Sequence, residues 1–399
     1  MRVLIIAEAF PPNKSPRALQ MAKVVDALFE AGCEVRVMAG LAENEMEMAS
    51  WRFPVQYVDS DKSRVSGALG RLSNRVLDSR LWCQWARKTR DACLQLMKDF
   101  RPDIILTVSN PYHSHYVGLL LHRRNSIPWV AFFSDPYPPA LLPAAHRWHT
   151  GTIRHLWDMR FIRKVLKGCS GVVMTNSYAL HLMERKMGIK IQDKSFVIPH
   201  VGSEPEKKIR CTDGCLVHIG NLTNRECPPL LEAVKQVASE MPKRFKGLVC
   251  VGRGYDEFRR IAREKNMEHL VTFIGQVSAC KASQIAAGSH ALLVIEADMP
   301  ESPFLPSKFA DYCMTGRPII AITPPMSSIR DYLTEYGGGV AVSHSVQEIA
   351  KAIRYVFSNS CSYHEGEKCS EAGGLSSVFQ ASAVAASYMQ MFEKLCHGT

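Results

Sequence analysis

Short apolar runs alternate with amphipathic segments along most of this chain. The first run, RVLIIAEAF, is followed by SPRALQMAKVVDALFEAG, whose apolar residues recur at helical spacing, and then by a second apolar run, CEVRVMAG. Period and length predict a strand, a helix and a strand, with a corner at Gly32. Such a βαβ unit carries its two strands in parallel.

The same alternation predicts two doubly wound domains in series. Further strands are expected near 102–109, 128–135 and 171–176, before a segment at 197–214 that is rich in Pro, Gly and charge. The pattern then restarts, with strands expected at 215–222, 247–254, 271–277, 291–297 and 317–322, and helices at about 228–241, through 261 and near 309–314.

The predicted class is therefore α/β, with two Rossmann-like domains facing a central cleft and ligands beyond the carboxyl ends of the strands. We place the first domain at 1–200 and the second at 201–375. Residues 376–399 are expected to form one amphipathic helix that packs back across the domains rather than binding a partner.

Composition agrees with a globular, cytoplasmic protein. The chain has 399 residues, of which 46% are hydrophobic, enough for two cores. Its 13 cysteines are irregularly spaced and form no CxxC pair, which indicates free thiols rather than disulfides or a zinc site. Met1-Arg2 leads directly into the first strand instead of a signal peptide, and no uncharged run is long enough to span a membrane.

Positive charge is concentrated in the first half. Residues 1–200 hold 28 Lys+Arg against 17 Asp+Glu, whereas residues 201–399 hold 21 of each. Residues 62–101 hold ten basic residues against three acidic ones, interleaved with Leu and Trp, and a second basic helix is expected at 154–168. This pattern is typical of peripheral contact with an anionic membrane at its inner face, and equally of ordinary amphipathic helices with solvated charges. Nucleic acid is disfavoured because no known binding module is present.

Glycine corners follow two of the predicted strands. Gly220 opens GNLTNR and Gly252 opens GRGYDEF. Such corners let backbone N–H groups approach a phosphate, although tight turns also use Gly for steric reasons alone. Neither is followed by a Walker lysine or completes GxGxxG, which disfavours P-loop hydrolysis and NAD chemistry.

A lysine stands at the next strand-to-helix corner, Pro306-Ser307-Lys308. Ser307 is suited to cap the helix, and Lys308 in the first turn opposes the helix dipole unless an anion is bound. A diphosphate would supply that anion, and Arg225 could reach the same group. Asp311, one turn further, could accept hydrogen bonds from ribose hydroxyls. The alternative is a solvated Lys–Asp pair.

These residues carry a family resemblance. PSKFADYCMTGRPIIA resembles the nucleotide-sugar segment of retaining, family-4-like GT-B glycosyltransferases (glycosyltransferase group 1), in variants with a Pro-Ser-Lys corner. FPPNKSPRALQMAKVVDALFEAGCEVRVMAG, PWVAFFSDPYPP, VIPHVGSE, HIGNLTNR and VGRGYDEF are similar to other parts of that family, so the resemblance covers most of the chain.

The resemblance implies an acceptor held by the first domain and a UDP- or GDP-sugar held by the second. Arg225 and Lys308 resemble the family's basic pair on the diphosphate. The family's two glutamates, eight positions apart, are not intact, because Pro303 stands eight residues before Asp311, and Glu301 is the nearest carboxylate. The implied donor-binding set is Arg225, Lys308, Ser307, Asp311, Glu301, Gly220, Asn221, Gly252 and Gly275.

The implied reaction needs no cofactor or metal, because two cations can stabilise the leaving diphosphate. Catalytic candidates that could orient an acceptor hydroxyl are His113, His115 and Asp135, which follow predicted strands. Ser15 and Arg17 occupy the loop that contacts donor phosphate or acceptor in the family, without its frequent Gly-Gly.

The predicted function is transfer of a sugar, with retention, to a glycan or lipid-linked acceptor in bacterial surface polysaccharide assembly. Two alternatives stay open, a sugar-nucleotide epimerase on the same scaffold and a non-catalytic sugar-nucleotide-binding subunit.

Overall fold

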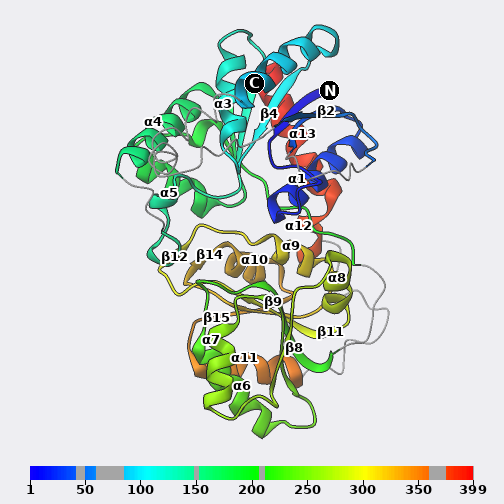
Figure 1. Ribbon diagram of the computed structural model, residues 1–399. Coiled ribbons are helices and arrows are strands. Elements are labelled where there is room, and N and C mark those ends of the chain that lie inside the picture. Colours follow the sequence, from blue (N-terminus) through cyan, green and yellow to red (C-terminus); the bar gives the residue numbers. More distant parts are fainter. Residues whose placement is uncertain (42–49, 60–84, 148–151, 206–211, 359–373, 399) are drawn as a thin grey trace, which may run out of the picture. The chain divides into compact units, whose positions relative to one another are not determined.

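The computed structural model describes residues 1–41, 50–59, 85–147, 152–205, 212–358 and 374–398 (Figure 1). The chain divides into two compact units. Unit 1 comprises 1–142, 147–200 and 381–399, and unit 2 comprises 143–146 and 201–380. Each unit contains a parallel sheet with helices, which confirms the predicted α/β class.

Unit 1 is built on a seven-stranded sheet in the order β3-β2-β1-β4-β5-β6-β7. Every pairing in it is parallel; for example, Ile5 is in register with both Val37 and Leu106. Its strands are β1 (Arg2–Ala7), β2 (Glu34–Leu41), β3 (Val55–Asp59), β4 (Ile104–Val108), β5 (Trp129–Phe133), β6 (Gly171–Met174) and β7 (Ser195–Val197).

Helices flank this sheet. The buried residues of 85–100, α3, α4 and α5 pack with those of the strands in one core. Helices α1 and α13, far apart in sequence, lie against each other, blue beside red in Figure 1. The helices are α1 (Pro16–Glu30), residues 85–100, α3 (His113–His122), α4 (Thr152–Gly168), α5 (Ser177–Met187) and α13 (Ala381–His397), with 3-10 turns η1 (Pro139–Leu141), η2 (Ala144–His146, in unit 2) and η3 (Gln192–Lys194).

Unit 2 repeats the arrangement with the order β10-β9-β8-β11-β13-β15. Two further strands of this unit, β12 and β14, have two residues each and pair with each other in parallel as a separate small sheet. Its strands are β8 (Thr212–Asn221), β9 (Gly247–Arg253), β10 (Val271–Ile274), β11 (Ser289–Ile295), β12 (Glu301–Ser302), β13 (Ile319–Ile322), β14 (Met326–Ser327) and β15 (Gly339–Val342).

The strands of unit 2 bury both faces, as parallel sheets do. Alternate residues of one strand enter different cores, Leu216 packing with α6, α7 and α11, and Val217 with α8, α9, α10 and α12. The helices are α6 (Pro228–Glu240), α7 (Asp256–Glu264), α8 (Ala279–Ala287), α9 (Ser307–Cys313), α10 (Ser328–Tyr336), α11 (Val346–Ser358) and α12 (Leu375–Phe379).

The end of the chain differs from the prediction of one helix over 376–399. The structure has two helices, α12 and α13, separated by Gln380, whose ψ of 142° is extended. Helix α12 belongs to unit 2, where Phe379 meets Phe309 edge to face at 5.6 Å between ring centroids. Helix α13 belongs to unit 1. The two helices have separate cores to cover, and the extended residue divides them.

Both sheets have the Rossmann strand order, which reverses between β1 and β4 in unit 1 and between β8 and β11 in unit 2. Ligands of such sheets bind beyond the carboxyl ends of the strands at this switch point. Functional side chains are therefore expected directly after β1, β4, β8 and β11. Within the described ranges, no helix combines the length and apolar character that a membrane crossing requires.

Candidate active site

Two glycine corners bring the ends of β8 and β9 together. Gly220 has φ +120° and Gly252 has φ +122°, conformations that other residues rarely adopt. A Cβ on Gly252 would stand 2.3 Å from the carbonyl oxygen of Gly220, whereas one on Gly220 would meet Lys308 at 3.8 Å. Asn221 Oδ1 accepts from Thr223 N–H at 3.0 Å, which closes the turn. By contrast, a Cβ on Gly275 would meet nothing within 4 Å.

Lys308 points at this corner from the first turn of α9. Its Nζ lies 2.5 Å from Nε2 of His218, a residue of β8 that is 1% exposed. Asp311 accepts instead from the backbone N–H of Ser203 at 2.8 Å. The alternative of a solvated Lys308–Asp311 pair is therefore wrong.

Ser307 does not cap α9, which corrects the prediction. Pro306 occupies the N-cap position with extended φ and ψ of −60° and 128°, and no side chain makes a cap hydrogen bond there. Ser307 is already the first helical residue, so its hydroxyl is one position too late to cap.

His218, Arg225 and Lys308 form what we call the basic cluster. Burial lowers the pKa of Lys308 well below its ordinary value, and the charge of Arg225 lowers it further, against a smaller opposite effect of Cys250. Burial also lowers the pKa of His218, with Lys308 and Arg225 acting in the same direction. Lys308 and Arg225, which repel each other in a partly desolvated corner, would be stabilised by a bound anion.

Glu296, one residue after β11, was not identified from the sequence. Its carboxylate is 3% exposed and accepts from the hydroxyls of Ser302 and Ser327. Burial raises the pKa of Glu296 to about 7, although the two serines, Arg225 and Arg330 oppose the shift. A carboxylate directly after a strand at the switch point was the available signal. Glu301, the predicted candidate, lies in β12.

In unit 1 the structure brings Arg17 and Asp135 together. The guanidinium donates to the Asp135 carboxylate at 2.7 Å, joining the start of α1 to the end of β5. Burial lowers the pKa of Arg17, but the attraction of Asp135 outweighs it and the net pKa is raised. The Ser15 hydroxyl accepts from Ala18 N–H at 3.3 Å and so caps α1.

The two histidines lie in α3 and differ in environment. His113 Nδ1 is 2.5 Å from the carboxylate of Glu8, the residue after β1, so this pair marks the switch point of unit 1. His115 is 0% exposed, contacts Thr107 Oγ1 at 2.8 Å, and has its pKa lowered to about 3 by burial. A neutral, enclosed ring cannot touch an acceptor, so the prediction of His115 at an open strand end is wrong.

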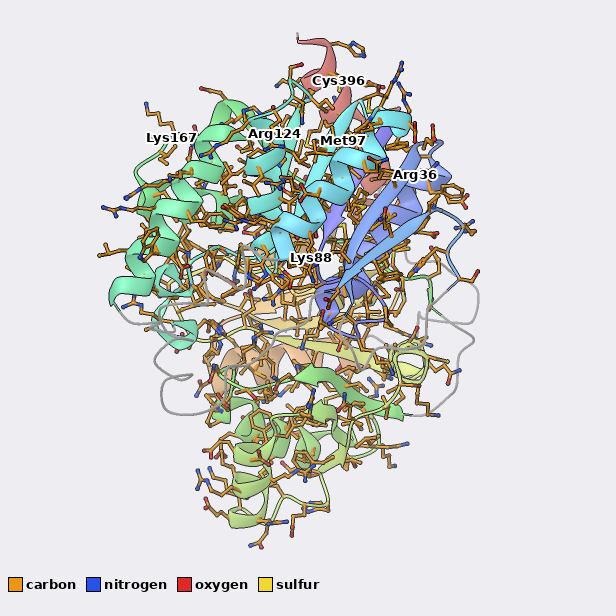
Figure 2. All side chains as sticks on the ribbon, turned by 45° about the horizontal axis from the view of Figure 1, so that its top comes forward. Arg36, Lys88, Met97, Arg124, Lys167 and Cys396 are labelled. Carbon is orange, nitrogen blue, oxygen red and sulfur yellow. The ribbon has the colours of Figure 1, made fainter. Side chains whose placement is uncertain are left out.

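Of the basic segment predicted at 62–101, residues 62–84 lie outside the described residues. From 85 onward its helix turns its apolar face inward, with Trp85 5% exposed in the core of unit 1. The second basic helix, α4, is different, because Leu156 and Trp157 are 57% and 64% exposed. Exposed basic side chains continue this stripe at Arg160, Lys164 and Lys167, and Figure 2 shows Lys167 projecting from the helix.

Among the described residues, no group of three or more His, Cys, Asp or Glu side chains is arranged to hold a metal ion. The predicted metal independence stays a prediction.

Comparison with known proteins places the fold. No family model and no curated protein matches the sequence. Among solved structures, sucrose-phosphate synthase from Thermosynechococcus elongatus is similar over 100% of both chains, with a TM-score of 0.67 and 14% identity. HepE from Anabaena, solved with UDP-glucose, is similar over 100% of this chain and 98% of its own, with 0.58 and 13%. UDP-GlcNAc 2-epimerase from Methanocaldococcus jannaschii is similar over 98% and 99%, with 0.53 and 12%.

These likenesses extend over the full length and define the fold as GT-B, as the sequence predicted. At identities of 12 to 14% they establish the fold alone, and the reaction has to be argued from the residues.

Proposed function

We propose that this protein is a glycosyltransferase that moves a sugar from a UDP- or GDP-sugar to a glycan or lipid-linked acceptor, with retention and without a metal. The observation that carries the proposal is the basic cluster at the switch point of unit 2, next to Gly220. The GT-B fold and its likeness to a protein solved with UDP-glucose support it.

The donor diphosphate would be held by Arg225 and Lys308, whose charges also stabilise the leaving group as the glycosidic bond to phosphate breaks. Asp311 would accept from a ribose hydroxyl. Glu301, in β12, would accept hydrogen bonds from hydroxyls of the sugar ring. Proton removal from the acceptor hydroxyl falls to the leaving phosphate, as the family resemblance implies.

The acceptor would be oriented by residues of unit 1. Asp135 with Arg17 offers a fixed, partly exposed carboxylate, and His113 with Glu8 offers a carboxylate-held imidazole. A lipid-linked acceptor agrees with the exposed Leu156, Trp157 and basic residues of α4, because such a stripe suits an anionic membrane surface. Assembly of a bacterial surface polysaccharide is the role that fits this acceptor best.

The test is binding and turnover with a panel of UDP-, GDP-, ADP- and dTDP-sugars. A ligand that binds only the native protein raises Tm with concentration. We expect one nucleotide sugar to stabilise wild type and to release nucleotide slowly. Lys308→Met should lose both signals while keeping the wild-type Tm without ligand to within a few degrees. Lys281→Met, which changes an exposed lysine of α8, is the matched control and should behave as wild type.

Other outcomes separate the alternatives. Conversion of the donor into an isomeric nucleotide sugar without acceptor would replace the transferase by an epimerase, whose fold likeness motivates this check. If a nucleotide sugar binds but is not consumed in the presence of any extract that contains acceptors, the non-catalytic subunit is favoured. Retention would be read by NMR from the anomeric configuration of the product. Binding that survives Lys308→Met unchanged would contradict the assignment of the site.

A further inference from the structure

His218 has a partner at each ring nitrogen. Its Nε2 lies 2.5 Å from Lys308 Nζ, and its Nδ1 lies 2.7 Å from the hydroxyl of Tyr255, which precedes α7 and is 2% exposed. Lys308, His218 and Tyr255 thus form a continuous chain of side-chain hydrogen bonds, which we call the relay. It joins residues from β8, the start of α7 and α9.

The relay is continuous when Lys308 is charged. The ammonium then donates to Nε2 of His218, and Nδ1–H donates to the Tyr255 oxygen. The Tyr255 hydroxyl in turn donates to a carbonyl, either Val251 at 3.0 Å or Gly220 at 3.2 Å. Both ring nitrogens of His218 and the Tyr255 hydroxyl then have partners.

The relay is also satisfied with one proton fewer. If Lys308 is a neutral amine, Nε2–H of His218 donates to its lone pair, and the Tyr255 hydroxyl turns to donate to Nδ1. Buried polar groups are costly only when they lack partners, and here neither pattern leaves a ring nitrogen unpaired. The two patterns differ by one proton and by the tautomer of His218.

The charged and titratable groups around the relay determine which of the two patterns is populated. The charged or titratable groups acting on Lys308 are His218, Arg225 and Cys250, while Glu296 acts on Arg225. Tyr312, also on α9, accepts from Ile219 N–H at 2.9 Å and stands outside the relay. Burial and its neighbours lower the pKa of His218, so the ring is neutral in both patterns. The pKa of Lys308 is lowered too, and an incoming anion would oppose that shift.

We propose that the relay couples binding of a donor diphosphate to uptake of one proton, with His218 as the positioning residue that holds the Lys308 ammonium toward the anion. This inference rests on the proposed function, because it takes a nucleotide sugar as the ligand. On binding, the protein gains one anion and one proton from solvent, and the ring proton of His218 moves from Nε2 to Nδ1. No other covalent bond forms or breaks. Because binding takes up a proton, affinity falls as pH rises.

The direct test is calorimetry with UDP-glucose and GDP-mannose, whose diphosphates carry no group that titrates near neutral pH. Binding heats are measured between pH 6 and 9 in pairs of buffers with different ionisation enthalpies, which gives the number of protons taken up. We expect uptake to approach about one proton per ligand within this range. Binding with no proton uptake at any of these pH values would overturn the relay.

Variants separate positioning from simple packing. His218→Phe removes the acceptor of Lys308, and we expect the pH at which affinity is lost to move down by about one unit. His218→Gln keeps an acceptor oxygen and should restore most of that shift, and Tyr255→Phe should give a smaller shift in the same direction. Tyr312→Phe removes a buried hydroxyl nearby and should leave the pH profile in place. Identical profiles in His218→Phe and wild type would mean that His218 only fills space.

A measurement without ligand keeps the two proposals distinguishable. If neither nucleotide sugar binds wild type, the proposed function fails for these donors, and the relay is judged from the imidazole nitrogen NMR signals of His218. The relay predicts a neutral ring whose proton changes from Nε2 to Nδ1 as Lys308 gains its charge. A ring that keeps one tautomer from pH 6 to 10, or that becomes cationic near its ordinary pKa, would overturn it.

Discussion

The two units differ in the charge balance of the side chains at the carboxyl ends of their similar sheets. In unit 1 each basic side chain meets a carboxylate, Arg17 with Asp135 and His113 with Glu8. In unit 2 two groups of positive sign, Lys308 and Arg225, lie close together, and Lys308 contacts the neutral ring of His218. A neutralised pair can hold a neutral hydroxyl, whereas an excess of positive charge favours an anion. The same strand order therefore supports two kinds of ligand.

The largest expected effect is on donor binding, when one positive charge of unit 2 is removed. Arg225→Met should weaken binding of the stabilising nucleotide sugar by roughly 100-fold, the size of a charge-assisted hydrogen bond in a partly buried site. Arg17→Met, the matched change in unit 1, should alter donor affinity less than about twofold, because Asp135 already balances that charge.

Calorimetric titration of both variants with the same donor measures the difference. Equal losses in the two variants would contradict the assignment of donor and acceptor to different units. A loss in Arg17→Met alone would reverse the assignment.

Much of the fold could be predicted because it depends on local patterns. Strands buried on both faces appear as apolar runs, and their alternation with helices specifies a parallel sheet. Lys308 was found because Pro306 and Ser307 mark a corner, and a lysine is conspicuous there. Placing the cap one residue late at Ser307 reflects the usual uncertainty of helix ends. The break at Gln380 carries no Gly or Pro to mark it.

The residues that were missed became neighbours only through tertiary packing. His218 stands inside an apolar run and Tyr255 follows another strand, so each looks like an ordinary core residue by itself. Their contact with Lys308 requires β8, the start of α7 and α9 to meet. Glu296 gains its serine partners from β12 and β14 in the same way. Conversely, His115 was selected for its position after a strand, while helix α3, in which it is the third residue, turns it into the core.

An effect of intermediate size concerns how the free energy of unfolding depends on pH, through one buried group in each unit. The folded-state pKa of Glu296 is raised to about 7 by burial, so this group favours folding below its ordinary pKa and loses that contribution as pH rises toward 7. The pKa of His115 is lowered to about 3 by burial, so this group loses stability as pH falls below its ordinary value near 6.5. Between pH 5 and 7 each contributes about 2 kcal/mol, in opposite directions.

Glu296→Gln and His115→Gln should therefore change the pH dependence of unfolding in opposite senses. Relative to wild type, Glu296→Gln gains stability from pH 5 to 7, and His115→Gln loses it by a similar amount. Urea unfolding at both pH values measures the two slopes, with Glu257→Gln, a partly exposed carboxylate of α7, as the control. Parallel slopes in all three variants would mean that neither burial has the effect described.

The smallest expected effect concerns the surface of unit 1. Helix α4 exposes Leu156 and Trp157 beside Arg160, Lys164 and Lys167, while the apolar face of residues 85–100 is turned into the core. If the acceptor is lipid-linked, Trp157→Ala should weaken binding to vesicles containing anionic phospholipid by about three- to tenfold, since insertion of one aromatic side chain contributes on the order of 1 kcal/mol.

Co-sedimentation with anionic and with neutral vesicles measures this change, and raising the salt concentration should weaken the wild-type interaction because it is partly electrostatic. Donor binding should be the same in Trp157→Ala and wild type, since the substitution is in unit 1 and on an exposed face. Tyr355→Ala removes a side chain that is 60% exposed on α11 of unit 2, and is the matched control. Vesicle binding that is equally strong in all three proteins would exclude α4 as the membrane contact and would leave a soluble glycan as the better acceptor for unit 1.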